Sequence, residues 1–230
     1  MTNKLWVFGD SFAEVSNNFE SWQLKIANEL QLDLMNVSIN GCSADWLMFK
    51  WNELHQQISV DDRIIIVIPF PDRVCFWPDR PSVSGIASLS SSPEKLKGIS
   101  EQSKLAIKMY FTHLHNTAFS QARINAWLQW VELFAHTATH KPIIMHSTNL
   151  SKNLKMQYCE IAEGNIIDAS INEFADHNTW VKISSSGAWL DPRTGHLSTQ
   201  NHKVLADKIL NFWNTSEPID LNSGWHTAII

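Results

Sequence analysis

Residues 63–68 are Arg63-Ile64-Ile65-Ile66-Val67-Ile68, an unbroken run of β-branched apolar side chains after one charged residue. A strand with one face in water alternates apolar and polar residues, so this run predicts a strand buried on both faces, as in a parallel sheet. Shorter apolar runs at 5–8, 32–37 and 142–146 predict three further strands, and 165–168 predicts a short fifth.

Helical patterns fill the intervals between these strands. Apolar residues recur at helical spacing over 20–30, 44–58 and 199–213, which predicts three helices. The same spacing over 101–139 predicts one long helix or two consecutive ones. The apolar face of the first would hold Leu105, Met109, Phe111, Leu114 and Phe119. Alternating strands and helices predict an α/β fold with a mostly parallel sheet of about five strands and right-handed crossovers. We expect one domain over 1–214 and a C-terminal tail over 215–230.

Length, charge and composition exclude several classes of protein. The 230 residues suffice for one sizeable core, and a net charge of -5 without a basic cluster argues against a nucleic-acid partner. We see no signal peptide and no apolar run long enough for a membrane span, so we expect a cytoplasmic protein. Three scattered cysteines predict neither a disulfide framework nor a metal site, and no phosphate-binding loop is present, so no cofactor is expected.

Two short segments carry the chemistry. Gly9-Asp10-Ser11 ends the first predicted strand, and open α/β sheets place reactive groups at the carboxyl ends of their strands. A serine nucleophile needs a base and an orienting acid, and the late loop that holds Asp191 and His196 supplies both types. We therefore interpret Ser11 as nucleophile, His196 as base and Asp191 as the third member of a triad, and expect Asp10 to hold the turn.

The order of these segments resembles the SGNH/GDSL hydrolases, which are serine esterases, lipases and carbohydrate deacetylases. Their first block matches Gly9-Asp10-Ser11, their Asn-rich second block is similar to 36–41, and their last block is similar to the segment with His196 and His202. The resemblance implies a flavodoxin-like three-layer sandwich. It also implies an oxyanion hole built from the backbone N–H groups of Ser11 and Gly41.

The chain departs from the family pattern in two places. The usual acid lies three residues before the histidine, where this chain has Arg193, and Asp191 lies two residues earlier. After the third strand the family has Gly-x-Asn-Asp, whereas this chain has Ile68-Pro69-Phe70-Pro71-Asp72-Arg73, without the asparagine that helps to bind the oxyanion. Asn40 and Asn149 are candidate substitutes. Arg73 is a candidate for recognising an anionic substrate group.

Three functions stay open from the sequence. The first is a serine esterase or acetylesterase that cleaves a small acyl ester, with a sugar as candidate alcohol. The eleven tryptophans and the Pro- and Ser-rich segment 69–93 motivate the choice of a sugar. Candidate substrate contacts are Asp10, Asp72 and Trp77. Trp46 and Trp189 are further candidates for lining the site. The second is a weakly active or inactive binding module for glycan or protein. The third is an assembly component, a homo-oligomer included, that uses the tail and long helices.

Overall fold

A single parallel sheet forms the centre of the fold. The computed structural model describes residues 2–15, 20–71, 73, 100–147, 155–166 and 196–225. Its five strands lie in the order β2-β1-β3-β4-β5, and each strand is parallel to its neighbours. The strands are β1 (Lys4–Gly9), β2 (Asp33–Ser38), β3 (Arg63–Ile68), β4 (Ile143–His146) and β5 (Glu160–Ile161). This order is the flavodoxin-like one, and the predicted α/β class is confirmed.

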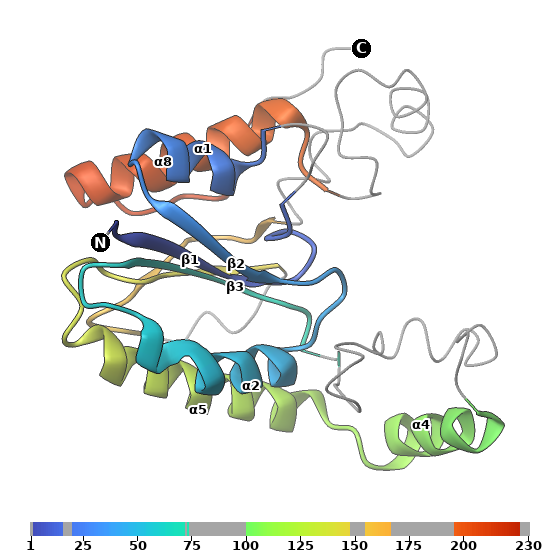
Figure 1. Cartoon of the computed structure of the whole chain (residues 1–230). Coiled ribbons are helices and arrows are strands. Elements are labelled where there is room, and N and C mark those ends of the chain that lie inside the picture. The colour runs from blue at the N-terminus through green and yellow to red at the C-terminus, as the bar shows by residue number, and fades with distance from the viewer. Residues whose placement is uncertain are drawn as a thin grey trace, which may run out of the picture.

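Helices cover both faces of the sheet and complete three layers (Figure 1). On one face lie α1 (Trp22–Glu29) and α8 (Thr199–Thr215), which contact each other. On the other face lie α2 (Ala44–Leu54) and α5 (Thr117–Ala135). The predicted helix over 44–58 is shorter than expected, because a 3-10 turn, η1 (His55–Gln57), follows α2.

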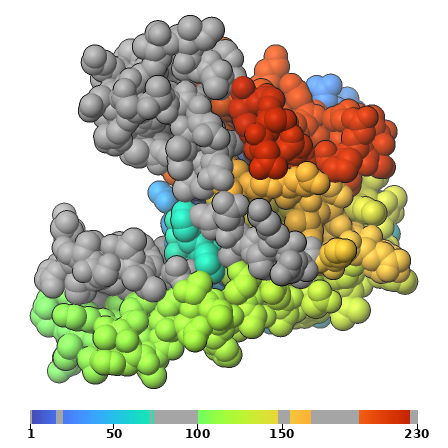
Figure 2. Space-filling view, turned by 180° about the vertical axis from the view of Figure 1, so that it is seen from behind, coloured from blue at the N-terminus to red at the C-terminus, as the bar shows by residue number. Residues whose placement is uncertain are grey.

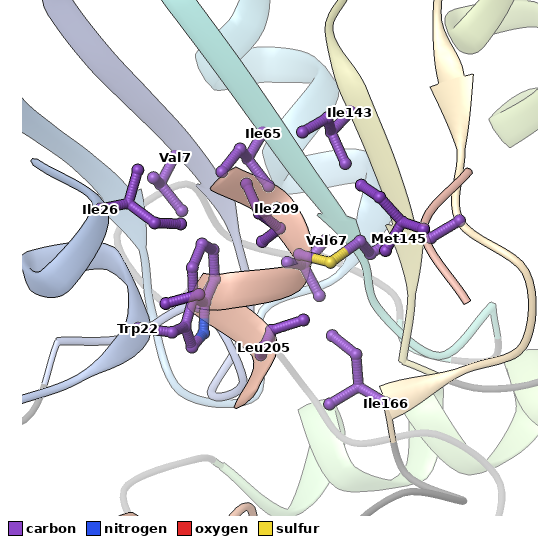
Figure 3. Packing of buried hydrophobic residues seen from close by; sticks show 14 of the residues in the cluster. Val7, Trp22, Ile26, Ile65, Val67, Ile143, Met145, Ile166, Leu205 and Ile209 are labelled. Carbon is purple, nitrogen blue, oxygen red and sulfur yellow. The ribbon is translucent and has the colours of Figure 1, made fainter. Parts of the chain in front are cut away.

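The unbroken apolar run in β3 supplies both cores. Ile65 and Val67 point to the α1/α8 side, where they pack with Trp22, Leu205 and Ile209 (Figure 3). Ile64, Ile66 and Ile68 belong to the cluster on the opposite face, beneath α2 and α5. We call these two clusters the α1/α8 core and the α2/α5 core. Because successive strand side chains face opposite sides, a strand between two helical layers needs apolar residues at every position.

The apolar face expected on the first half of 101–139 is wrong. The region forms two helices, α4 (Glu101–His113) and α5, and α4 lies past the carboxyl ends of the strands rather than over a face of the sheet (Figure 1). Leu105 is 60% exposed and Leu114 is 74% exposed, whereas Ile107 is buried. Figure 2 shows α4 and α5 running along one side of the molecule. Helical spacing identified the helix but not the layer that would cover its apolar residues.

The predicted fifth strand is also misplaced. The strand next to β4 is β5, a pairing of two residues with Ile143 and Ile144. Asn165 and Ile166 belong to no strand, and the rest of 165–168 lies outside the described residues. Ile166 is helical and fully buried in the α1/α8 core, so its apolar character reflects burial rather than strand pairing.

The start of the expected tail packs on the domain. Ile219 and Leu221 are buried in the α1/α8 core, and Asp220 forms an isolated bridge with Glu163. The chain up to residue 225 therefore contributes to the folded unit, although the boundary at 214 stays a prediction. Within the described ranges, no helix combines the length and apolar composition needed to cross a membrane.

Candidate active site

The candidate site lies at the carboxyl ends of the two central strands. Ser11 follows β1, and Arg73 follows the neighbouring strand β3 shortly after its end. From β1 the chain crosses to β2 on one side, while β3 lies on the other side, so the connections diverge here. Such a switch point is where open α/β sheets place their ligands.

Two hydrogen bonds to Asp10, one to its side chain and one to its backbone, hold the turn after β1. An Asp10 carboxylate oxygen accepts the Phe12 N–H at 3.1 Å, and the Asp10 carbonyl accepts the Ala13 N–H at 2.9 Å. A Cβ atom added to Gly9 would lie 2.5 Å from the Ala13 Cβ and 2.9 Å from the Val67 Cβ. Only glycine fits this close approach, which sets the position of Ser11 two residues later.

His196 meets Ser11 across 185 positions of sequence. The distance from His196 Nε2 to Ser11 Oγ is 2.8 Å, within hydrogen-bond reach for proton transfer. The imidazole also stacks on the Phe12 ring, with centroids 4.6 Å apart and planes 21° apart. Ser11 is 3% exposed, so the pair lies in a largely buried setting. The arrangement can activate a serine hydroxyl when Nδ1 carries the ring proton.

The start of α8 fixes the segment that carries His196. Ser198 caps the helix by accepting the Asn201 N–H at 3.1 Å. His202, in the first turn, accepts the Trp22 backbone N–H on Nδ1 at 3.3 Å. The Trp22 indole donates to the Phe12 carbonyl at 2.9 Å. His202 is therefore a buried structural residue that connects α8 with α1 and with the turn beside Ser11.

A second turn, after β2, lies against the first. The Gly9 carbonyl accepts the Ile39 N–H at 3.3 Å and contacts the Cys42 thiol at 3.1 Å. Gly41 between them has a φ of 72°, in the left-handed region that glycine adopts readily. The backbone N–H groups of Ser11 and Gly41 donate to no other residue in the described ranges. Both remain available for an oxyanion.

Asp10 forms a buried ion pair beneath the nucleophile. Its carboxylate is fully buried, accepts Arg73 Nη1 at 2.7 Å, and lies 3.3 Å from the Ser147 hydroxyl, which donates to it. Burial raises the pKa of Asp10, and the Arg73 charge and the Phe12 N–H oppose that rise. Arg73 also lies over the Phe70 ring, with 4.8 Å from Cζ to the centroid.

A buried imidazole lies at the same edge of the sheet. His146 ends β4, and burial lowers its pKa to about 4. Its Nδ1 has no hydrogen-bond partner among the residues that the structure describes. This ring is therefore neutral at neutral pH.

The predicted site residues divide into three groups. Ser11, His196, Gly41, Asp10 and Arg73 lie in the described structure and come together around the β1 turn. Asn40 is exposed on the neighbouring turn, and Trp46 packs in the α2/α5 core rather than in the site. The predictions for Asp191, Asp72, Trp77, Trp189 and Asn149 lie outside the described residues.

Sequence reasoning missed three supporting contacts. These are the stack of Phe12 on His196, the ion pair between Asp10 and Arg73, and the Ser147 hydroxyl. Ser147 directly follows β4, so its place at the carboxyl end of a strand was a usable signal. Among the described residues, no group of three metal-ligating side chains lies together.

Solved structures of other proteins are similar to this chain. A crystal structure of a member of the lipolytic protein G-D-S-L family from Veillonella parvula is similar to this chain, with a TM-score of 0.44 and 11% sequence identity. The match covers 92% of this chain and 98% of that one. The sequence matches no protein-family model, and the search of curated proteins found no match.

Proposed function

We propose that this protein is a serine hydrolase that cleaves small acyl esters. The observation that carries the proposal is the 2.8 Å contact between His196 Nε2 and Ser11 Oγ at the switch point of the sheet. The resemblance of the motif order to the SGNH/GDSL hydrolases supports the same reaction. A serine beside a histidine is the pairing that acyl transfer requires.

In the proposed reaction, Ser11 Oγ attacks the acyl carbonyl while His196 Nε2 takes the hydroxyl proton. The carbonyl oxygen becomes an oxyanion, which accepts hydrogen bonds from the Ser11 and Gly41 N–H groups. His196 returns the proton to the leaving alcohol, and the acyl group stays on Ser11. Water then attacks this ester with His196 as base, which releases the acid and restores the serine. Asp191 is proposed to hold the imidazole in the required tautomer.

The proposed acyl group is small. The Ser11 side chain is 3% exposed and lies against the His196 ring, which itself packs on Phe12. A bulky acyl chain would have to displace this packed surface, whereas an acetyl group adds only two carbons. A sugar as the alcohol remains part of the proposal.

A fluorophosphonate probe together with an ester assay tests this function. The wild-type chain should become labelled and should hydrolyse 4-nitrophenyl acetate, and Ser11→Ala should do neither. Ser120→Ala is the matched control and should be labelled like the wild type, because Ser120 is also a buried serine but lies on α5, outside the site. Labelling that survives in Ser11→Ala would contradict the proposal.

The alternative is a binding module with weak or no hydrolysis. The observation that favours it is the absence of the family's asparagine after β3, where this chain has Phe70-Pro71-Asp72-Arg73. One missing oxyanion donor costs about 10²–10³ in rate. A folded wild-type chain that neither reacts with the probe nor hydrolyses any short-chain ester would select this alternative.

A further inference from the structure

Arg73 lies between the two turns that supply the proposed oxyanion donors. Its Nη1 is 2.7 Å from the carboxylate of Asp10, the residue before Ser11. The same nitrogen is 3.4 Å from the carbonyl of Cys42, the residue after Gly41. The guanidinium therefore spans the short gap between the Ser11 turn and the Gly41 turn.

Three contacts position the Arg73 guanidinium and leave some of its N–H donors over. The Asp10 carboxylate, the Cys42 carbonyl and the face of the Phe70 ring fix its position. Its Nε and Nη2 donate to no residue in the ranges that the structure describes. The Arg73 side chain is 17% exposed, so these remaining N–H groups lie in a partly dehydrated setting. A fixed cation with spare donors in such a setting stabilises developing negative charge well.

The charge of Asp10 also favours a cation at this position. A buried carboxylate one residue from the nucleophile would repel an oxyanion formed at Ser11. Arg73 neutralises that carboxylate and still has N–H groups that can donate to a second anion. A lysine ammonium group would do this less well, because it lacks the planar array of donors of a guanidinium.

We propose that Arg73 is a catalytic residue that donates to the oxyanion, in the role left vacant by the missing asparagine. The inference rests on the proposed function, because it requires an oxyanion at Ser11. The donor is a cation rather than a neutral amide, so it contributes charge as well as a hydrogen bond. The expected benefit falls on the transition state, not on binding of the ester.

The test compares Asp10→Asn with the double variant Asp10→Asn/Arg73→Met. Neither leaves a buried carboxylate without a partner, so both are expected to fold. The double variant should have a kcat about 100- to 1,000-fold below that of Asp10→Asn, with KM within about threefold. If Arg73 served only to neutralise Asp10, the two variants would have the same kcat, and that result would overturn the inference.

Two ester substrates distinguish the oxyanion role from recognition of an anionic substrate group. The neutral substrate is 4-nitrophenyl acetate, and the charged one is the 4-nitrophenyl monoester of succinate, which carries a free carboxylate. Loss of kcat on both substrates supports the inference. A rise in KM confined to the succinate ester would overturn it and would identify Arg73 as an anion-binding residue.

Controls separate failure of this inference from failure of the proposed function. Arg123→Met removes a different Arg–Asp ion pair, 3.1 Å to Asp45 between α5 and α2, and should leave kcat unchanged. Circular dichroism and the urea midpoint check that each variant is folded. If wild-type Ser11 reacts with the fluorophosphonate but the two Asp10 variants turn over equally, only the role of Arg73 fails. If wild-type Ser11 does not react, both proposals fail.

Discussion

Substituting Gly9 by alanine should both destabilise the fold and displace the nucleophile. The added Cβ would lie 2.5 Å from the Ala13 Cβ, 2.9 Å from the Val67 Cβ and 3.3 Å from the Val67 carbonyl oxygen. These neighbours are backbone atoms or atoms attached directly to it, so they cannot rotate away. To reach ordinary contact, the turn that holds Asp10 and Ser11 must shift by about 1 Å, at a cost of about 1–3 kcal/mol of unfolding free energy.

A shift of that size at the nucleophile lowers kcat/KM by about 100-fold. Urea unfolding and hydrolysis of 4-nitrophenyl acetate measure the two effects on the same preparation. Ala13→Gly removes the closest of the contacts, so Gly9→Ala/Ala13→Gly should recover part of both losses, with a coupling energy of about 1 kcal/mol. Gly9→Ala with stability within about 0.5 kcal/mol of the wild type and activity within twofold would refute this reasoning.

Three further predictions concern the scaffold. When the pH falls from neutral to about 4, the wild type should lose about 3 kcal/mol of unfolding free energy that His146→Leu does not lose. The reason is that the pKa of His146 falls from 6.5 to about 4 on folding, so the unfolded chain takes up the proton first; urea titrations along the pH series measure it, and equal slopes would contradict it. Asp62→Ala should lower the free energy of unfolding by about 3 kcal/mol, because its buried carboxylate accepts the Trp6 indole and two backbone N–H groups; a loss below about 1 kcal/mol would count against those bonds. Leu105→Ser should change the urea midpoint little, whereas Ile107→Ser on the same helix should lower it, and the reverse ranking would show that the exposed face is wrongly assigned.

The layers of the fold were predictable because the β3 run admits few alternatives. Five consecutive apolar residues after Arg63 require burial on both faces, and the structure places them alternately in the two cores. The position of α4 was not predictable, because helical spacing describes one face of a helix but not what lies opposite. The fifth strand was misplaced for a related reason, since a fully buried residue outside the sheet, such as Ile166, is as apolar as a residue of a buried strand.

The sequence predicted which residues take part in the site, but only some of the contacts between them. Ser11 and His196 could be named from motif order, and the structure brings their side chains within 2.8 Å. The Asp10–Arg73 pair spans 63 positions of sequence, so no local spacing rule indicates it. Its physical signal was a carboxylate placed directly after a buried strand, which requires a cationic partner when it is buried.

The central claim is that the histidine at 196 makes the hydroxyl of Ser11 nucleophilic. The most direct measurement is the second-order rate of fluorophosphonate labelling, with the modified residue identified by peptide mass spectrometry, in the wild type and in His196→Gln. We predict an adduct on Ser11 that forms at least about 100-fold more slowly in the variant. Labelling at another residue, or equal rates in the two proteins, would contradict the account.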